Sequence, residues 1–156
     1  MSGSLIKRLA EARSKGDVGR LAEAIPYARW MRIAPENTTG ELLTRMRFDD
    51  KIVGNTMLPA IHGGTIGALL ESAAIFHMLW HSDSVNLPKI VNITVDYLRS
   101  ARPVDTLAKA TVTKQGRRMV NVFVEAWQDD RARPVAIANA HFLVQPPEGE
   151  TLPVSL

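Results

Sequence analysis

An acidic residue within an apolar run is the first feature of this sequence that could do chemistry. Glu71 stands among leucines and alanines in a stretch that predicts a buried helix from His62 to His81. A carboxyl group held away from water tends to have a raised pKa, which suits it to act as a general base. The alternative is a glutamate that pairs with an arginine at a subunit contact and takes no part in a reaction.

Two glycines, Gly63 and Gly64, stand at the predicted start of the same helix. The first amides of a helix have no intrahelical acceptors and lie at the positive end of its dipole. Because glycine has no side chain to block a substrate oxygen, these amides are candidate donors of an oxyanion hole, although Gly-Gly before a helix is also common in tight turns. His62 is a further candidate catalytic residue, but we expect it to shape the loop through its ring nitrogens.

The spacing of these residues predicts how the protein assembles. Glu71 follows Gly63 by eight residues, which corresponds to about 12 Å along a helix. One carbonyl group cannot easily contact both residues of a single chain. Two antiparallel copies of the helix would place Gly63 of one copy beside Glu71 of the other, so we expect an active site shared across a two-fold dimer.

The helix needs a sheet to pack against, and the rest of the pattern supplies one. Alternating or mainly apolar runs predict five strands, at Gly40–Phe48, Lys89–Leu98, Leu107–Lys114, Met119–Trp127 and Val135–Val144. One long helix against one face of a curved antiparallel sheet is an α+β fold. We expect residues 1–39 to form an N-terminal helical extension and residues 40–156 to form the main domain. Tyr27, Trp30 and Met31 are expected to cover one end of the core, with a lid over a ligand as the alternative.

Composition narrows the classes of function. The 156 residues are 46% apolar and 22% charged, which is typical of a folded globular protein. A net charge of +3 is too small to predict a nucleic-acid partner, and the lack of cysteine excludes a disulfide framework and a thiol nucleophile. The longest apolar stretch, Ile66–Trp80, is shorter than the roughly 20 residues of a membrane span, and the start has no signal-peptide pattern. We therefore expect a cytoplasmic protein without a membrane partner.

Four arginines could bind phosphate groups. Arg99 and Arg102 follow one predicted strand, and Arg117 and Arg118 lie in a turn between two others. A guanidinium group donates two parallel hydrogen bonds to phosphate, although the solvated rim of a turn often has the same composition.

Metal and serine chemistry are disfavoured. His77 and His81 have a spacing that metal pairs use, but no third ligand is evident near them in the sequence. The serines do not stand in a GxSxG setting. We therefore expect no metal and no cofactor.

The motifs together resemble those of a known family. Residues 61–64 (IHGG), with Glu71 nine positions after the histidine, resemble the central-helix motif of hotdog-fold thioesterases of the phenylacetic-acid-degradation (PaaI) type. Residues 95–102 (VDYLRSAR) look like the strand that leads into a basic turn in that family, and residues 116–118 and 135–140 continue the match.

The resemblance covers roughly Gly40 to Gln145 and implies a hotdog fold, in which five to six strands wrap the helix. It also implies hydrolysis of an acyl- or aryl-CoA thioester to the free acid and CoA, by a dimer or a dimer of dimers. In the family, a glycine amide at the helix start polarises the thioester carbonyl, and an acid on the partner helix is the nucleophile or the base for water. These roles would fall on Gly63 and Glu71, and the CoA phosphates would meet the four arginines.

The sequence departs from the family pattern at several positions. Many relatives have Asp in place of Glu71, and the branch with Glu often has Thr where this chain has Ile75. Thr56 replaces an Asn or Gln that positions substrate or water, so we expect the adjacent Asn55 to reach the site through a loop one residue longer. Two alternatives stay open: a non-catalytic module that binds acyl-CoA or a protein, and a hydratase or dehydratase, which the lack of a paired Asp-His motif disfavours.

Overall fold

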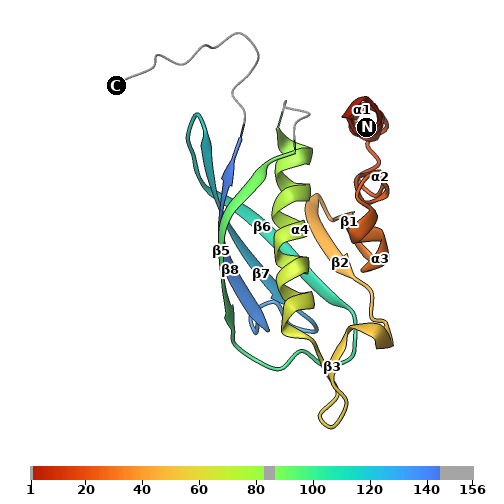
Figure 1. Ribbon diagram of the computed structural model, residues 1–156, viewed down its shortest axis with the longest axis vertical. Helices are drawn as coiled ribbons and strands as arrows, with labels where there is room; N and C mark the ends of the chain where they lie inside the picture. The colour runs from red at the N-terminus through yellow and green to blue at the C-terminus, as the bar shows by residue number, and fades with distance from the viewer. Residues whose placement is uncertain (1, 83–86, 145–156) are drawn as a thin grey trace.

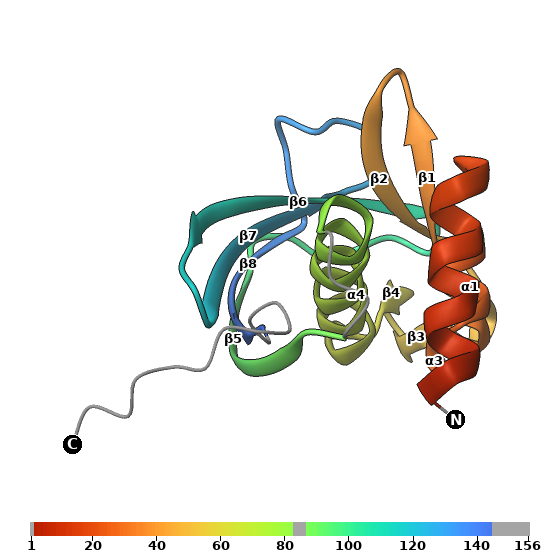
Figure 2. The same ribbon diagram turned by 90° about the horizontal axis from the view of Figure 1, so that it is seen from above.

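One long helix lies along the inside of a curved sheet. The computed structural model describes residues 2–82 and 87–144, with side chains from residue 7 onward. Helix α4 (Gly63–His81) runs along the concave face of a six-stranded antiparallel sheet (Figure 1). Seen from above, the sheet curls around the helix (Figure 2). The α+β architecture expected from the sequence is confirmed.

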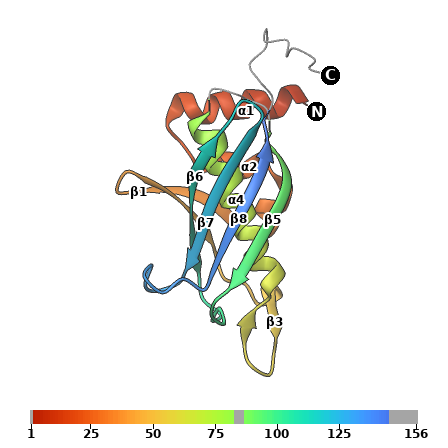
Figure 3. The same ribbon diagram turned by 90° about the vertical axis from the view of Figure 1, so that its left-hand side faces the viewer.

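The strands follow the order β1-β2-β6-β7-β8-β5 across the sheet, so β1 and β5 are its two edges. Their bounds are β1 Ile33–Thr38, β2 Glu41–Met46, β5 Lys89–Tyr97, β6 Thr106–Gln115, β7 Met119–Trp127 and β8 Ala136–Leu143. A short 3₁₀ helix, η1 (Asp50–Ile52), leads into a two-stranded sheet of β3 (Val53–Asn55) and β4 (Ala60–Ile61). This β3–β4 hairpin extends beyond the end of the large sheet (Figure 3).

The five predicted strands are all present, with ends within two residues of those expected, but β1 was missed. Ile33–Thr38 contains Pro35 and a polar second half, a pattern that does not alternate as an interior strand does. Because β1 is an edge strand, the proline disrupts little. The predicted helical extension of residues 1–39 is therefore too long: the last N-terminal helix ends at Trp30. The division of the chain into domains stays a prediction.

The N-terminal segment forms three helices, α1 (Ser2–Lys15), α2 (Arg20–Glu23) and α3 (Pro26–Trp30). Gly16 follows α1 with a φ of 65°, a conformation that glycine adopts without strain and that ends a helix. On α1, Leu9 is buried, and Arg13 Nε donates a hydrogen bond to the Leu79 carbonyl oxygen at 3.1 Å. This bond attaches α1 to the last turn of α4.

The aromatic residues expected to cover the core lie largely on the surface, which corrects that prediction. Tyr27 and Trp30 stack with their ring centroids 6.0 Å apart and have exposed fractions of 56% and 57%. Met31, the third residue of that prediction, is buried in the core as expected, and so is Ala28 of α3. The Lys51 ammonium group lies 4.9 Å from the Trp30 ring centroid and adds a cation–π contact on the outside.

Small residues let the helix approach the sheet closely. Ala136, Ala138 and Ala140 are buried on the inner face of β8, as their shared spacing predicts. The large buried residues of α4 that complete this core include Leu69, Leu70, Phe76 and Leu79. Such alternation of small and large side chains is typical of a well-packed interface between helix and sheet.

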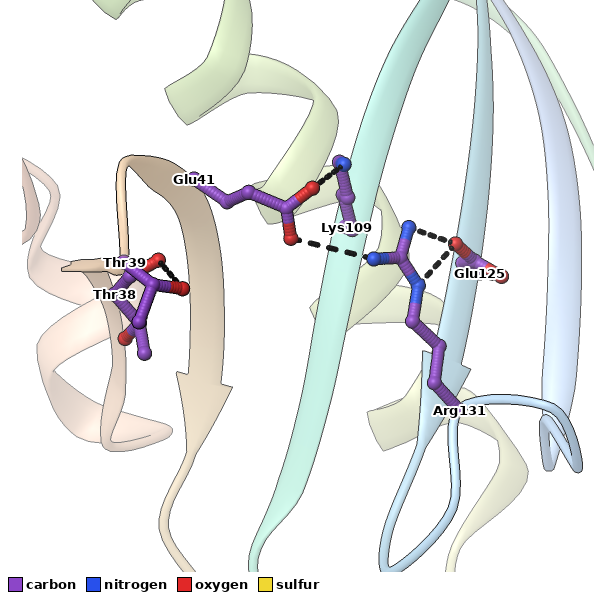
Figure 4. Close-up of polar contacts among 6 residues, drawn as sticks. All are labelled: Thr38, Thr39, Glu41, Lys109, Glu125 and Arg131. Carbon is purple, nitrogen blue, oxygen red and sulfur yellow. Dashed lines mark hydrogen bonds and ion pairs between the residues drawn. The ribbon is translucent and has the colours of Figure 1, made fainter.

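Ion pairs join the strands on the outer face of the sheet (Figure 4). The Lys109 ammonium group of β6 donates a hydrogen bond to Glu41 of β2. Arg131 lies between two acids, with Nη1 3.3 Å from a Glu41 oxygen and Nε 2.8 Å from a Glu125 oxygen. The hydrogen bond from Lys109, with the charges of Lys109 and Arg131, holds the pKa of Glu41 below its ordinary value. The Arg131 guanidinium also lies 5.1 Å from the centroid of the Trp127 ring and covers it.

Candidate active site at the start of the central helix

His62 caps helix α4. Its backbone is extended, with φ −61° and ψ 133°, and its ring Nδ1 accepts a hydrogen bond from the Gly64 amide at 2.9 Å. Its carbonyl oxygen accepts from the amides of Thr65 at 2.9 Å and Ile66 at 3.2 Å. An N-cap satisfies amides that the helix itself cannot, so the ring nitrogen shapes the start of α4. A direct catalytic role for His62 stays a prediction.

The His62 ring lies between two glycines, one on each side. A Cβ atom added to Gly64 would lie 3.0 Å from His62 Nδ1, and one added to Gly54 of β3 would lie 2.7 Å from His62 Cα. Both distances are shorter than an ordinary contact between these atoms. Gly54 and Gly64 therefore leave the space in which the histidine turns back to cap the helix.

The cap leaves one amide of the first turn available. The Gly64 amide is used by His62, whereas within the described part of the chain the Gly63 amide has no acceptor. Gly63 lines a pocket of about 380 Å³ at the start of α4, bounded by Ile61 and Ile66 and by the segment after β5. Of the two predicted oxyanion donors, Gly63 is thus the one that remains available to a ligand.

Arg99 lines the same pocket as Gly63, although 36 positions separate them in the sequence. Its Nη1 donates a hydrogen bond to the Pro134 carbonyl oxygen at 2.6 Å, which holds the guanidinium group against the segment that leads into β8. The structure therefore places one predicted phosphate ligand and the predicted amide donor on the lining of one pocket. A cationic group beside an amide donor favours an anionic or strongly polar ligand.

The other three arginines lie elsewhere in the chain. Arg102, just beyond the pocket, forms an ion pair with Asp129, and its amide donates to Gln128 Oε1 at 3.0 Å. Arg117 and Arg118 lie in the turn between β6 and β7, at the opposite end of the sheet (Figure 1). β6 alone is ten residues long, so about 33 Å of strand separates this turn from the pocket end. A single subunit does not gather the four arginines.

Glu71 is half-buried and lies outside the pocket lining. It shares the face of α4 that points away from the sheet with Gly64, Gly67 and Ala68, whereas Leu70 and the other core-facing residues are buried. This corrects the expectation of a deeply buried acid within one chain. Within the described residues, the Glu71 carboxylate has no hydrogen bond or ion pair.

Asn55 stabilises the loop of the β3–β4 hairpin. Its side-chain oxygen accepts hydrogen bonds from the amides of Met57 at 2.9 Å and Leu58 at 3.2 Å. Asn55 and Thr56 are exposed, and neither lines the pocket of their own subunit. The expectation that Asn55 reaches the active site is not met within one chain.

The paired histidines near the end of α4 have no metal-binding partner among the residues that the structure describes. The rings of His77 and His81 have centroids 4.3 Å apart, and His81 Nδ1 lies 2.9 Å from the His77 carbonyl oxygen. Among residues 2–82 and 87–144, no group of three or more metal-binding side chains is found. Burial, with the charges of His81 and Lys109, lowers the pKa of His77 from 6.5 to about 4, so its ring is neutral at pH 7.

Tyr97 is a site residue that the sequence pattern does not single out. It lies at the end of β5, and its hydroxyl donates a hydrogen bond to the Gly63 carbonyl oxygen at 2.8 Å. The alternation of β5 marks this residue only as one more member of the helix-facing side. Nothing in this alternation indicates that the Tyr97 hydroxyl reaches the start of α4, 34 positions earlier in the chain.

The comparison with protein families agrees with this geometry. The thioesterase superfamily matches residues 58–135, which include the capped start of α4, Glu71, Tyr97 and Arg99. The match spans half of the chain. The chain belongs to the thioesterase superfamily. The resemblance to hotdog-fold thioesterases is confirmed, and membership supports thioester hydrolysis as the general activity of this thioesterase-superfamily protein.

Solved structures have the same fold as this thioesterase-superfamily protein. A protein from Chromobacterium violaceum is 40% identical, with a TM-score of 0.74 over 91% of this chain and 99% of that one. A phenylacetic acid degradation-related protein from Ralstonia eutropha JMP134 is 20% identical, with a TM-score of 0.70 over 88% and 99%. A Bacillus halodurans protein solved with CoA is 17% identical, with a TM-score of 0.67 over 91% and 89%. No curated protein matches the chain.

No helix in the described part of this thioesterase-superfamily protein is both long enough and apolar enough to cross a membrane.

Proposed function

We propose that this protein hydrolyses the thioester bond of an acyl- or aryl-CoA, releasing the free acid and CoA, in an active site shared by two copies of the chain. The observation that carries the proposal is the pocket at the start of α4, where the Gly63 amide and Arg99 lie together. An amide donor suits a carbonyl oxygen, and an arginine beside it suits a phosphate-bearing carrier.

The Gly63 amide would bind the thioester carbonyl oxygen. Negative charge develops on this oxygen when a nucleophile adds to the carbonyl carbon, and a fixed N–H group stabilises that charge. Because the dipole of α4 has its positive end at Gly63, the helix adds to this stabilisation.

Glu71 of the partner subunit would supply the base. Its carboxylate accepts a proton from water as the water oxygen bonds to the carbonyl carbon. The tetrahedral intermediate then collapses, the C–S bond breaks, and the proton passes to the departing CoA sulfur. Direct attack by the carboxylate, followed by hydrolysis of the anhydride, gives the same products, and both routes need the acid opposite Gly63.

The open surfaces of one subunit support such a pairing. β5 is an edge strand of nine residues, and Val91 and Tyr97 on it have exposed fractions of 57% and 56%. At the tip of the β3–β4 hairpin, Met57 and Leu58 are 89% and 73% exposed. Exposed apolar side chains beside an unpaired strand edge are typical of an interface. Antiparallel pairing of two β5 strands would join the sheets and lay the two α4 helices side by side in opposite directions.

This arrangement also accounts for the scattered arginines. The turn with Arg117 and Arg118 lies at the end of the sheet where α4 ends, and an antiparallel partner brings that end toward the Gly63 pocket. Arg99 of one subunit and the turn of the other would then both face the phosphates of CoA. The CoA in the Bacillus halodurans structure is consistent with this ligand class.

A thiol-release assay over short, long and aromatic acyl-CoAs tests the proposal. We expect turnover of at least one class, with CoA appearing in step with the free acid. Binding of acyl-CoA without thiol release across the panel would instead indicate a non-catalytic binding module. Turnover of an enoyl-CoA without thiol release would indicate a hydratase.

A further inference from the structure

The peptide group between Gly63 and Gly64 is held by a side chain at each of its two polar atoms. The Tyr97 hydroxyl donates to the Gly63 carbonyl oxygen at 2.8 Å, and the Gly64 amide donates to His62 Nδ1 at 2.9 Å. A peptide group bound at both ends cannot rotate without losing a hydrogen bond. Hydrogen bonds in such a chain also polarise one another.

Each glycine of the pair makes room for one of these two rings. A Cβ atom added to Gly63 would lie 3.3 Å from Cε1 and Cζ of Tyr97, and one added to Gly64 would lie 3.0 Å from Nδ1 of His62. Gly67, one turn further along α4, would bring a Cβ atom 3.7 Å from the Tyr97 hydroxyl, an ordinary contact. The two glycines therefore serve the packing of Tyr97 and His62 as well as access for a substrate.

These contacts restrict the backbone on both sides of the Gly63 amide. On one side, the His62 carbonyl oxygen accepts from the amides of Thr65 and Ile66. On the other side, Tyr97 holds the Gly63 carbonyl oxygen. Glycine has more backbone freedom than any other residue, so two in succession would otherwise leave the first turn loosely defined. The Gly63 amide, which has no acceptor in the described residues, is thus held in one orientation.

We propose that Tyr97 is a positioning residue, which acts through the Gly63 carbonyl oxygen to orient the Gly63 amide toward the thioester carbonyl. The inference rests on the proposed function. Tyr97 acts on the Gly63 amide and does not contact CoA in this proposal. Its hydroxyl group therefore contributes to the chemical step and contributes little to the binding of CoA. Preorganised donors are effective because they need no reorientation during the reaction.

Replacing Tyr97 with Phe tests this role, because it removes the hydroxyl and keeps the ring against Gly63. The chain has one other tyrosine, Tyr27, which is also 56% exposed and lies on α3, so Tyr27→Phe is a matched control. We expect Tyr97→Phe to lower kcat about three- to tenfold with KM within about twofold, and Tyr27→Phe to change neither.

A spectroscopic measurement separates positioning from a general structural effect. The Gly64 amide belongs to the same peptide group as the Gly63 carbonyl, so its ¹H–¹⁵N resonance should move in Tyr97→Phe and stay in place in Tyr27→Phe. An unmoved Gly64 resonance, an unchanged kcat, or an equal loss in Tyr27→Phe would overturn the role of Tyr97.

The outcome also distinguishes the two proposals. Turnover by the wild type with an unaffected Tyr97→Phe rejects only the role of Tyr97. Absence of thioester turnover in the wild type rejects both the proposed function and the role built on it.

Discussion

Replacement of Gly54 with Ala should destabilise the protein, because the new methyl group has no space. It would lie 2.7 Å from His62 Cα, 2.8 Å from Cβ and 2.9 Å from Cδ2, whereas carbon atoms in contact are usually about 3.5–4.0 Å apart. Two of these atoms belong to the backbone or are attached directly to it, so a change of side-chain rotamer cannot relieve the overlap. β3 must move away from the segment that leads into α4.

The expected cost has two parts. Overpacking of this kind costs about 1–3 kcal/mol. If His62 is displaced far enough to lose the hydrogen bond from the Gly64 amide, the lost cap adds about 0.5–2 kcal/mol. We therefore expect Gly54→Ala to lower the free energy of unfolding by about 2–4 kcal/mol and to lower kcat, since the same displacement disturbs the first turn of α4.

Urea denaturation at one fixed protein concentration measures this change through the transition midpoint. The control is Gly19→Ala, because Gly19 has an ordinary helical φ of −59° and an added Cβ would meet only Asp17 Oδ1 at 3.4 Å. That variant should keep its stability or gain about 0.4–1 kcal/mol. A Gly54→Ala protein with the midpoint of the wild type would refute the close packing of β3 against His62.

Two further predictions concern the pocket and the pH dependence of stability. Arg99→Ala should raise KM for acyl-CoA about tenfold or more with kcat little changed, because it removes charged hydrogen bonds to the carrier, whereas Arg29→Ala on α3 should leave KM unchanged in the same steady-state assay. The pKa of His77 is about 4 in the folded state and 6.5 in the unfolded state. Between these two pH values only the unfolded state binds the proton, so the contribution of His77 to the free energy of unfolding is fully present above pH 6.5 and is lost as the pH falls toward 4. Urea denaturation at pH 7.5 and at pH 4.5 should show that the free energy of unfolding is lower at pH 4.5 by about 1–2 kcal/mol, a value reduced by the partial exposure of the His77 ring. The decrease should be smaller in His77→Leu, and an equal decrease in that variant would exclude His77 as its source.

The sequence predicts those parts of the fold whose pattern is local. The apolar run of α4 and the alternation of four long strands are visible without knowing their neighbours. β3 and β4 are three and two residues long, too short for a period to be recognised. Their pairing places Gly54 against His62, a close approach that no local pattern in the sequence indicates.

In the candidate site, too, local sequence patterns predict some residues, and others are placed only by tertiary contacts. His62 and Gly63 are adjacent in the sequence, so their role at a helix start could be predicted from the chain alone. Tyr97 could not, because its partner is 34 positions away on another element. The depth of Glu71 was overestimated because its apolar neighbours in the sequence point to the other face of α4. The predicted strand Leu107–Lys114 separates Arg102 from Arg117, so the sequence alone indicates that these two arginines lie at opposite ends of one strand.

Mixing two inactive variants tests the shared active site most directly. Gly63→Pro removes the amide at the first helical position, where proline is tolerated, and Gly63→Ala adds a Cβ atom while keeping that amide. We expect Gly63→Pro alone to lose about 10²–10³-fold in kcat, more than Gly63→Ala, and Glu71→Gln alone to lose about 10²–10⁴-fold.

A mixed dimer of Gly63→Pro and Glu71→Gln subunits contains one site with both groups intact, the Gly63 amide from one chain and the Glu71 carboxylate from the other. Purified mixed dimers, isolated with two different affinity tags, should recover about half of the wild-type kcat per dimer, because one of the two sites is complete. Mixed dimers that stay as inactive as their parents would contradict a site built from two subunits.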